Sequence, residues 1–170
     1  MQEIHGTDGA VSVLDVRKAY EMLTKRLIET GRTITAMESC TSGQIASLIT
    51  DTEGSSAILK GAFVTYSNIA KIKAGVPEEV IEQYGVYSAE CAAAMAEAAR
   101  AAFEADLSIG VTGSFGNADP ANSDSIPGEV YFAIAKESGT KCYHCVIPPQ
   151  PDRLAYKFYM ADVIVRNIEV

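Results

Sequence analysis

The stretch "RTITAMESCTSGQIASLITDT" (residues 32–52) changes its character half-way along. Residues 32–39 are typical of a short buried strand, and the residues from about Ser42 are typical of a helix that ends before Gly54. A strand that leads into a helix is the repeating step of α/β folds. Hydroxyl and thiol side chains from Ser39 onward stand at this junction, which makes it a candidate for chemistry as well.

The elements on either side extend the same pattern. A helix is expected from about Ser12 to Thr30, where apolar residues recur every three or four positions. Further strands are predicted at 57–67, 106–113, 129–136 and 141–147, and further helices at 68–76, 77–85, 88–105 and 151–168. Helices alternate with strands early, and three strands then follow. This order predicts a three-layer α/β/α domain with a mixed, mainly parallel, five-stranded sheet.

Length and composition indicate one domain. At 170 residues and 48% hydrophobic content, the chain is long enough to bury a sizeable core. We expect a single domain over residues 12–170 and a flexible tail over residues 1–11.

Charge and hydropathy exclude several classes of protein. The net charge of -8 and the pI near 4.7 argue against a nucleic-acid binder, because phosphate backbones require clustered Lys and Arg. No apolar run approaches the ~18 to 20 residues of a membrane span, and the first residues lack the apolar core of a signal peptide. The sequence therefore predicts a soluble, cytoplasmic protein that does not bind membranes.

The cysteines do not form an obvious framework. Four cysteines in a chain of this size are too few and too scattered for structural disulfides, so reduced thiols are expected. The motif "CYHC" (142–145) resembles a metal or redox motif, but it lies in a predicted strand. Side chains alternate between the faces of a strand, so Cys142 and Cys145 should point in opposite directions. We expect no metal site.

Three polar clusters follow predicted strands, at residues 38–43, 66–71 and 112–116. Such exits lie together in open α/β sheets, so one cleft is expected to hold all three. A helix that starts near Ser42 would direct free N–H groups at that cleft, where they favour a phosphate or carboxylate. Plain helix capping explains the same hydroxyl groups equally well. The long irregular segment 114–128 is expected to overhang the cleft.

Two basic residues extend this hypothesis. Lys71, in the second cluster, has the chemistry to act as general base for a serine if burial lowers its pKa. Arg153, at the start of the last predicted helix, has the geometry to bind a phosphate through two parallel hydrogen bonds. Taken alone, each residue also fits an ordinary place on the surface.

Five ordered motifs carry a resemblance: "MESCTSG" (37–43), "GSSAILKGAFVTYSNIAKIKAGV" (54–76), "YGVYSAECAAAMAEAAR" (84–100), "ADLSIGVTG" (105–113) and "PGEVYFAIA" (127–135). Together with a final helix that bears an arginine, they resemble the CinA C-terminal domain family, the nicotinamide-nucleotide amidohydrolases of the PncC type. The resemblance extends over nearly the whole chain from about residue 12, and implies the stand-alone, single-domain form of the family.

The family resemblance implies a reaction. It is the hydrolysis of the carboxamide of nicotinamide mononucleotide to nicotinate mononucleotide and ammonia, a step of pyridine-nucleotide salvage in NAD metabolism. The resemblance implies that no cofactor is needed, that the partner is a small nucleotide substrate, and that the protein is a homo-oligomer.

The resemblance also assigns residues. Ser39 is implied as the nucleophile, Lys71 as its base and Tyr66 as a proton-relay or orienting group. Cys40 is the rival nucleophile, but adjacent side chains that leave a strand point in different directions, and the resemblance favours Ser39. Substrate-binding residues are implied at Glu38, Thr41, Ser42, Gly43, Asn68, Thr112, Gly113 and Arg153.

Two positions depart from the family pattern. Ser42 stands where the family usually has a glycine. After Gly113 the family usually continues I-A-G-P-x-G-G, whereas this chain has "SFGNADPANSDSIPG" (114–128). The sequence therefore leaves open a second hypothesis, a nucleotide-binding module of the same fold that binds its ligand without turnover.

Overall fold

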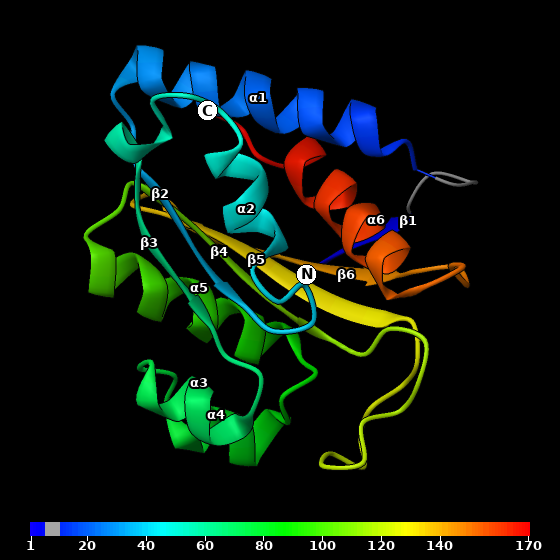
Figure 1. Cartoon of the computed structure of the whole chain (residues 1–170). Coiled ribbons are helices and arrows are strands. Elements are labelled where there is room, and N and C mark those ends of the chain that lie inside the picture. Colours follow the sequence, from blue (N-terminus) through cyan, green and yellow to red (C-terminus); the bar gives the residue numbers. More distant parts are fainter. Residues whose placement is uncertain (6–10) are drawn as a thin grey trace.

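A computed structural model describes residues 1–5 and 11–170. Within these residues the sheet has six strands in the order β1-β6-β5-β4-β2-β3 (Figure 1). Their bounds are β1 Gln2–His5, β2 Ile34–Glu38, β3 Leu59–Val64, β4 Leu107–Gly113, β5 Glu129–Lys136 and β6 Gly139–Val146. The β4–β5 and β5–β6 pairs are antiparallel and the other pairs are parallel, so β5 alone runs against the rest.

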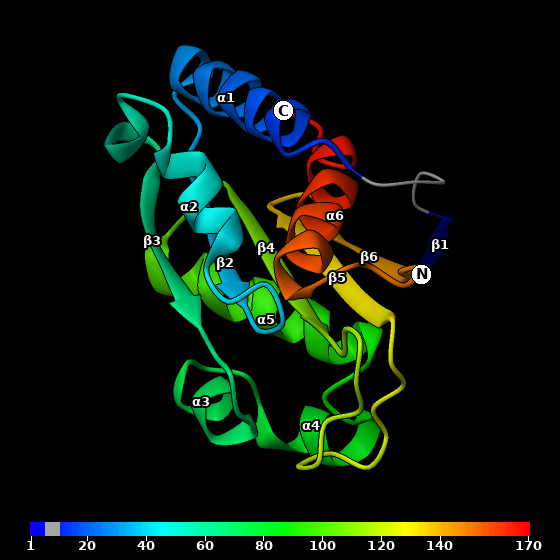
Figure 2. The ribbon, with the colours of Figure 1, turned by 45° about the vertical axis from the view of Figure 1, so that its right-hand side comes forward.

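Helices cover both faces of this sheet. One face carries α1 (Val13–Thr30), α2 (Gln44–Thr50) and α6 (Arg153–Arg166), and the other carries α3 (Asn68–Lys73), α4 (Glu78–Tyr84) and α5 (Ala89–Phe103), as Figures 1 and 2 show. A short 3₁₀ helix, Ser55–Ala57, precedes β3. On the first face, α1 packs on α2 and α6. The predicted three-layer arrangement and the mixed, mainly parallel sheet are confirmed.

Helix α1 shows how the sequence defines these layers. The Ser12 side chain accepts a hydrogen bond from the Asp15 N–H and caps the first turn. The helix ends at Gly31, whose φ of 66° is left-handed and suits a residue without a Cβ. Its buried residues, Val16, Tyr20, Leu23, Thr24 and Leu27, recur every three or four positions, which turns one stripe toward the core.

Helix α5 approaches the other face of the sheet closely because small residues meet there. A Cβ added at Gly110 in β4 would come within 2.2 Å of the Ala92 carbonyl oxygen and 2.5 Å of the Ala96 nitrogen. Only glycine fits at this point, and the alanines of α5 allow the contact. This packing fixes β4, whose end forms one wall of the candidate site.

The predicted number of strands is wrong by one. Strand β1, Gln2–His5, lies within the predicted tail and pairs in parallel with β6. It is held by backbone hydrogen bonds at the sheet edge, and four residues are too short to show a hydrophobic pattern. Residues 6–10 lie outside the described residues, so the rest of the tail remains a prediction, as do the domain bounds.

The structure also bears on two smaller predictions, which concern the cysteines of the CYHC motif and membrane-spanning helices. Cys145 is buried in the core that α1, α2 and α6 cover, whereas Cys142 packs with the alanines of α5, so the two thiols do lie on opposite faces of the sheet. Among the described residues, no helix combines the length and the apolar character that crossing a membrane requires.

Candidate active site

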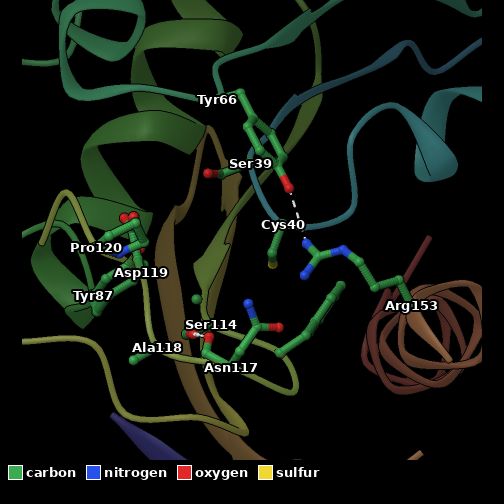
Figure 3. Close-up of a pocket in the computed structure, with 12 residues that line it drawn as sticks. Ser39, Cys40, Tyr66, Tyr87, Ser114, Asn117, Ala118, Asp119, Pro120 and Arg153 are labelled. Carbon is green, nitrogen blue, oxygen red and sulfur yellow. Dashed lines mark hydrogen bonds between the residues drawn. The ribbon is translucent and has the colours of Figure 1, made fainter. Parts of the chain in front are cut away.

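A cleft of about 300 Å³ opens where β2 and β4 end (Figure 3). These strands are parallel neighbours, so their carboxyl ends meet at one edge of the sheet. The predicted cleft at the strand exits therefore exists. The residues that line it are Ser39, Cys40, Tyr66, Tyr87, Gly113, Ser114, Phe115, Asn117, Ala118, Asp119, Pro120 and Arg153.

Ser39, which lines this cleft, forms a hydrogen-bonded pair with the buried Lys71. Ser39 directly follows β2, and its N–H donates to the Val111 carbonyl of β4 at 3.0 Å. Lys71 Nζ donates to Ser39 Oγ at 3.1 Å and to the Thr65 carbonyl oxygen at 3.2 Å. Both side chains are buried, Lys71 being only 3% exposed. A serine and an amine in this arrangement can exchange a proton.

The surroundings of Lys71 favour its neutral form. Burial lowers the pKa of Lys71 from its ordinary value, because the ammonium loses its hydration, while electrostatic interactions with Cys91, Cys40 and, least of the three, Asp119 oppose part of this effect. Among the described residues, the amine makes no ion pair with a carboxylate. Lys71 therefore has what a general base needs: contact with the nucleophile and a depressed pKa.

Cys40 lies in the same cleft but its thiol is poorly suited to attack. The residue is 4% exposed, and burial raises the pKa of its thiol to about 12, although the charge of Lys71 acts in the opposite direction. The thiolate is the reactive form of cysteine, so a thiol that stays protonated is a weak nucleophile at neutral pH.

Glu38 occupies the start of α2. Its carboxylate accepts hydrogen bonds from the N–H groups of Ile45 at 3.1 Å and Ala46 at 2.9 Å, and the residue is fully buried. The prediction that this helix start is free to bind a ligand is wrong for these two groups. The carboxylate instead satisfies the orphan N–H groups and the positive end of the helix dipole.

The alternative interpretation, that a hydroxyl caps α2, is wrong as well. The helix begins at Gln44, two residues after the expected start near Ser42, with Gly43 as N-cap at a left-handed φ of 88° and no side-chain cap. Ser42 too has a positive φ, 52°, and its hydroxyl donates to the Ser39 carbonyl oxygen at 3.3 Å. The Thr41 hydroxyl is buried and has no hydrogen-bond partner among the described residues. The tight turn prevents either hydroxyl from reaching the helix N–H groups.

Tyr66 and Arg153 meet at the rim of the cleft. Arg153 Nη2 donates to the Tyr66 hydroxyl at 2.9 Å, as Figure 3 shows. The guanidinium also lies 5.7 Å from the centroid of the Phe115 ring, which stacks on Tyr156. Tyr66 is 62% exposed and Arg153 is also exposed, so both polar groups remain accessible to a ligand.

Some of the predicted site residues line the cleft, and others do not. Ser39, Tyr66, Gly113 and Arg153 line it, and Lys71, which is not a lining residue, contacts Ser39. Glu38, Thr41, Ser42, Gly43, Asn68 and Thr112 are not among the residues that line it. Thr112 donates to the Val86 carbonyl oxygen at 2.8 Å and the Asn68 amide donates to Asn122 at 2.9 Å. Their role in substrate binding stays a prediction.

Sequence reasoning missed several cleft residues, including Tyr87, Asn117 and Asp119. Two of them belong to the long segment 114–128, which forms one wall of the cleft as its position predicted. Asp119 accepts a hydrogen bond from the Tyr87 hydroxyl at 2.6 Å, so the loop is tied to the segment before α5. The polar composition of the loop was the available signal, but it did not indicate which carboxylate faces inward.

Comparison with known proteins identifies the family to which this chain belongs. The model of the CinA C-terminal domain matches residues 16–162, most of the chain. The chain belongs to the CinA C-terminal domain family. A full-length relative, "Nicotinamide-nucleotide amidohydrolase PncC" of Escherichia coli (strain K12), is 40% identical over 126 residues, which are 74% of this chain and 76% of that protein.

Other members of the CinA family are longer. The "CinA-like protein" of Fervidobacterium nodosum is 34% identical over 131 residues, 76% of this chain but 32% of that protein. The chain thus spans about a third of that relative's length. Among crystal structures, a CinA superfamily protein from Escherichia coli has a TM-score of 0.78 at 27% identity, covering 94% of this chain and 95% of the other. CihA from Agrobacterium tumefaciens, at 24% identity, shares the fold with a TM-score of 0.81 over 94% of this chain and 96% of that one.

No metal centre is evident in the part of the chain that the structure describes, because no group of three or more His, Cys, Asp or Glu residues there could hold an ion. The cleft presents a serine, a phenol and a guanidinium, and a buried amine contacts the serine. This set is equipped for nucleophilic attack and proton transfer at a carbonyl group.

Proposed function

We propose that the protein hydrolyses the carboxamide of nicotinamide mononucleotide to nicotinate mononucleotide and ammonia, with Ser39 as nucleophile and Lys71 as base. The observation that carries the proposal is the hydrogen bond of 3.1 Å between Lys71 Nζ and Ser39 Oγ in a buried setting. The substrate is inferred from the PncC relative at 40% identity, whose name states that activity.

The first half of the proposed reaction forms an acyl-enzyme. Neutral Lys71 accepts the proton of Ser39 as Oγ attacks the carboxamide carbon. The resulting oxyanion needs a donor, and the Tyr66 hydroxyl accepts from Arg153, which leaves its own proton free for this purpose. Protonated Lys71 then gives its proton to the leaving nitrogen, and ammonia departs.

The second half releases the product. Lys71, neutral again, takes a proton from a water molecule that attacks the ester carbon on Ser39 Oγ. Collapse of this second intermediate returns the proton to Ser39 and frees the carboxylate of nicotinate mononucleotide. Arg153 at the rim is suited to bind the phosphate of the nucleotide, since a guanidinium forms two parallel hydrogen bonds with phosphate oxygens.

The competing hypothesis is a binding module without turnover. The altered loop 114–128 favours it, since this loop builds a wall of the cleft. The burial of Lys71 favours the enzyme, because an amine with a lowered pKa beside a serine hydroxyl has no evident use in binding alone.

Incubation of the purified protein with nicotinamide mononucleotide, followed by assays for ammonia and nicotinate mononucleotide, tests the proposal. We expect the two products to form in equal amounts, and we expect the Ser39→Ala variant to form neither above background. Binding of the nucleotide by wild-type protein without release of ammonia would favour the module hypothesis.

A further inference from the structure

Asp119 is the acidic residue that the loop 114–128 brings into the cleft. Its Oδ2 accepts hydrogen bonds from the Tyr87 hydroxyl and from the Asn122 amide, each at 2.6 Å. Its Oδ1 accepts from the Ala121 N–H at 2.9 Å. Three donors from two parts of the chain therefore hold the carboxylate in one orientation.

This carboxylate carries a charge that the protein leaves unpaired. The hydrogen bonds from Tyr87 and Asn122 lower the pKa of Asp119, so it is ionised at neutral pH. Among the described residues it forms no ion pair with Lys or Arg. The nearby charge of Lys71 does not compensate it in the proposed reaction, because Lys71 must be neutral to act as base.

The other fixed charge of the cleft lies across from it. In the view of Figure 3, Asp119 and Arg153 stand on opposite sides of the cleft, and Ser39 and Cys40 lie between them. The cleft therefore has an anionic wall and a cationic wall with the nucleophile in the middle. A ligand with separated positive and negative groups fits such a cleft in one direction only.

We propose that Asp119 is a specificity-determining residue, which binds the positively charged ring of the ligand while Arg153 faces the ligand's anionic group. The inference rests on the proposed function, whose substrate carries a quaternary ring nitrogen and a phosphate. An ionised carboxylate in a partly enclosed cleft attracts the charged ring and gives no such advantage to a neutral ring.

The test compares two ligands that differ in the charge of the ring. Nicotinamide mononucleotide has a cationic ring, and its 1,4-dihydro form has a neutral ring with the same carboxamide, ribose and phosphate. Calorimetric Kd values are measured in the Ser39→Ala variant, which removes turnover and keeps every charge. We expect the cationic ligand to bind about ten-fold more tightly, the size of one partly solvated charge contact.

Substitutions then assign the preference to Asp119. In the Ser39→Ala background, Asp119→Asn should weaken binding of the cationic ligand about ten-fold and leave the neutral one within about two-fold, which removes the preference. Asp124→Asn is the matched control, since Asp124 lies on the same loop, is exposed and does not line the cleft. It should keep the preference. Circular dichroism and thermal melting establish that the variants are folded.

Each outcome bears on the inference. Equal affinity of the two ligands, or an unchanged preference in Asp119→Asn, would overturn it, and so would a failure of both ligands to bind. If Asp119→Asn does not fold, the comparison of ligands in Ser39→Ala still decides, together with Tyr87→Phe, which keeps the charge and should reduce the preference only in part. Release of ammonia by the wild type is a separate readout. The proposed function can therefore hold when this inference fails, and the ring preference can hold when no ammonia is released.

Discussion

Two neighbouring strands of the sheet end at the cleft in very different ways. Strand β2 ends at the fully buried Glu38, whose carboxylate binds the start of α2, and a tight turn follows in which Ser39 is 9% exposed. After β4, residues 114–128 form a long loop whose members 116–118 and 120–121 are exposed. The reacting groups Ser39 and Lys71 therefore belong to the buried part of the protein, whereas one wall of the cleft is formed largely by exposed residues.

This division has a physical reason. A nucleophile and its base must be held within a few tenths of an ångström, which close packing provides. A surface loop can change the sequence of its exposed residues at low cost to the fold. The turn after β2 should therefore tolerate little change, and the loop after β4 should tolerate more.

The largest expected effect on catalysis comes from the buried pair, Ser39 and Lys71. Ser39→Ala and Lys71→Ala should each lower kcat by roughly 10³-fold or more, because the pair acts as one unit, and the double variant should be little worse than either. Steady-state assays of ammonia release measure this. If the losses of the two single variants multiply in the double variant, the two residues act independently and the account of the pair is wrong.

The next prediction concerns pH. Only neutral Lys71 accepts the serine proton, so kcat should rise as pH rises through the pKa of Lys71, about ten-fold per pH unit on the acidic limb. Burial lowers this pKa, so the rise should lie at lower pH than for an exposed lysine. A flat profile from about pH 6 to 9, with chemistry limiting the rate, would exclude a lysine base.

The loop 114–128 should also affect the pH dependence of kcat, through Asp119. The Asp119 carboxylate on the loop raises the pKa of Lys71, in opposition to the effect of burial. In Asp119→Asn the acidic limb should therefore move to lower pH, without the loss of the limb that removal of Lys71 would cause. An unchanged limb would mean that the loop acts on the ligand alone.

A smaller effect is expected for the helix cap. Glu38→Gln puts an amide group where one of two carboxylate oxygens accepts from the N–H groups of Ile45 and Ala46. We expect a loss of about 1 to 2 kcal/mol in the free energy of unfolding, measured by urea denaturation. Glu53→Gln, at an exposed residue, is the control and should change stability by less than about 0.5 kcal/mol. Equal stability of the two variants would show that the cap is not needed.

Much of this fold could be predicted because its elements carry strong periodic patterns. The stripe of α1 and the strand-to-helix junction at Ser39 are examples. Strand β1 could not be predicted, since its four residues join the edge of the sheet through backbone pairing that any sequence can make. In the candidate site too, residues within local motifs could be predicted and contacts that depend on the folded chain could not. Ser39 and Lys71 lie at sequence motifs, whereas the capping by Glu38 depends on a turn whose geometry the sequence does not specify.

The orientation of Asp119 is a second feature that could not be predicted from the sequence. The loop 114–128 contains two aspartates, Asp119 and Asp124, in similar polar surroundings. Only Asp119 lines the cleft, because Tyr87, from before α5, donates to its carboxylate. A contact between residues so far apart in the chain leaves no local pattern. The sequence therefore predicted that the loop 114–128 borders the cleft, but not that Asp119 places a negative charge there.

The role of Ser39 as nucleophile is tested by identifying the residue that carries the acyl group. The protein is mixed with nicotinamide mononucleotide, quenched with acid within milliseconds, digested and analysed by mass spectrometry. We expect the added mass of the acyl mononucleotide on Ser39, and no such mass in the Ser39→Ala variant. The same mass on Cys40, or release of ammonia at the full rate by a folded Ser39→Ala variant, would contradict it.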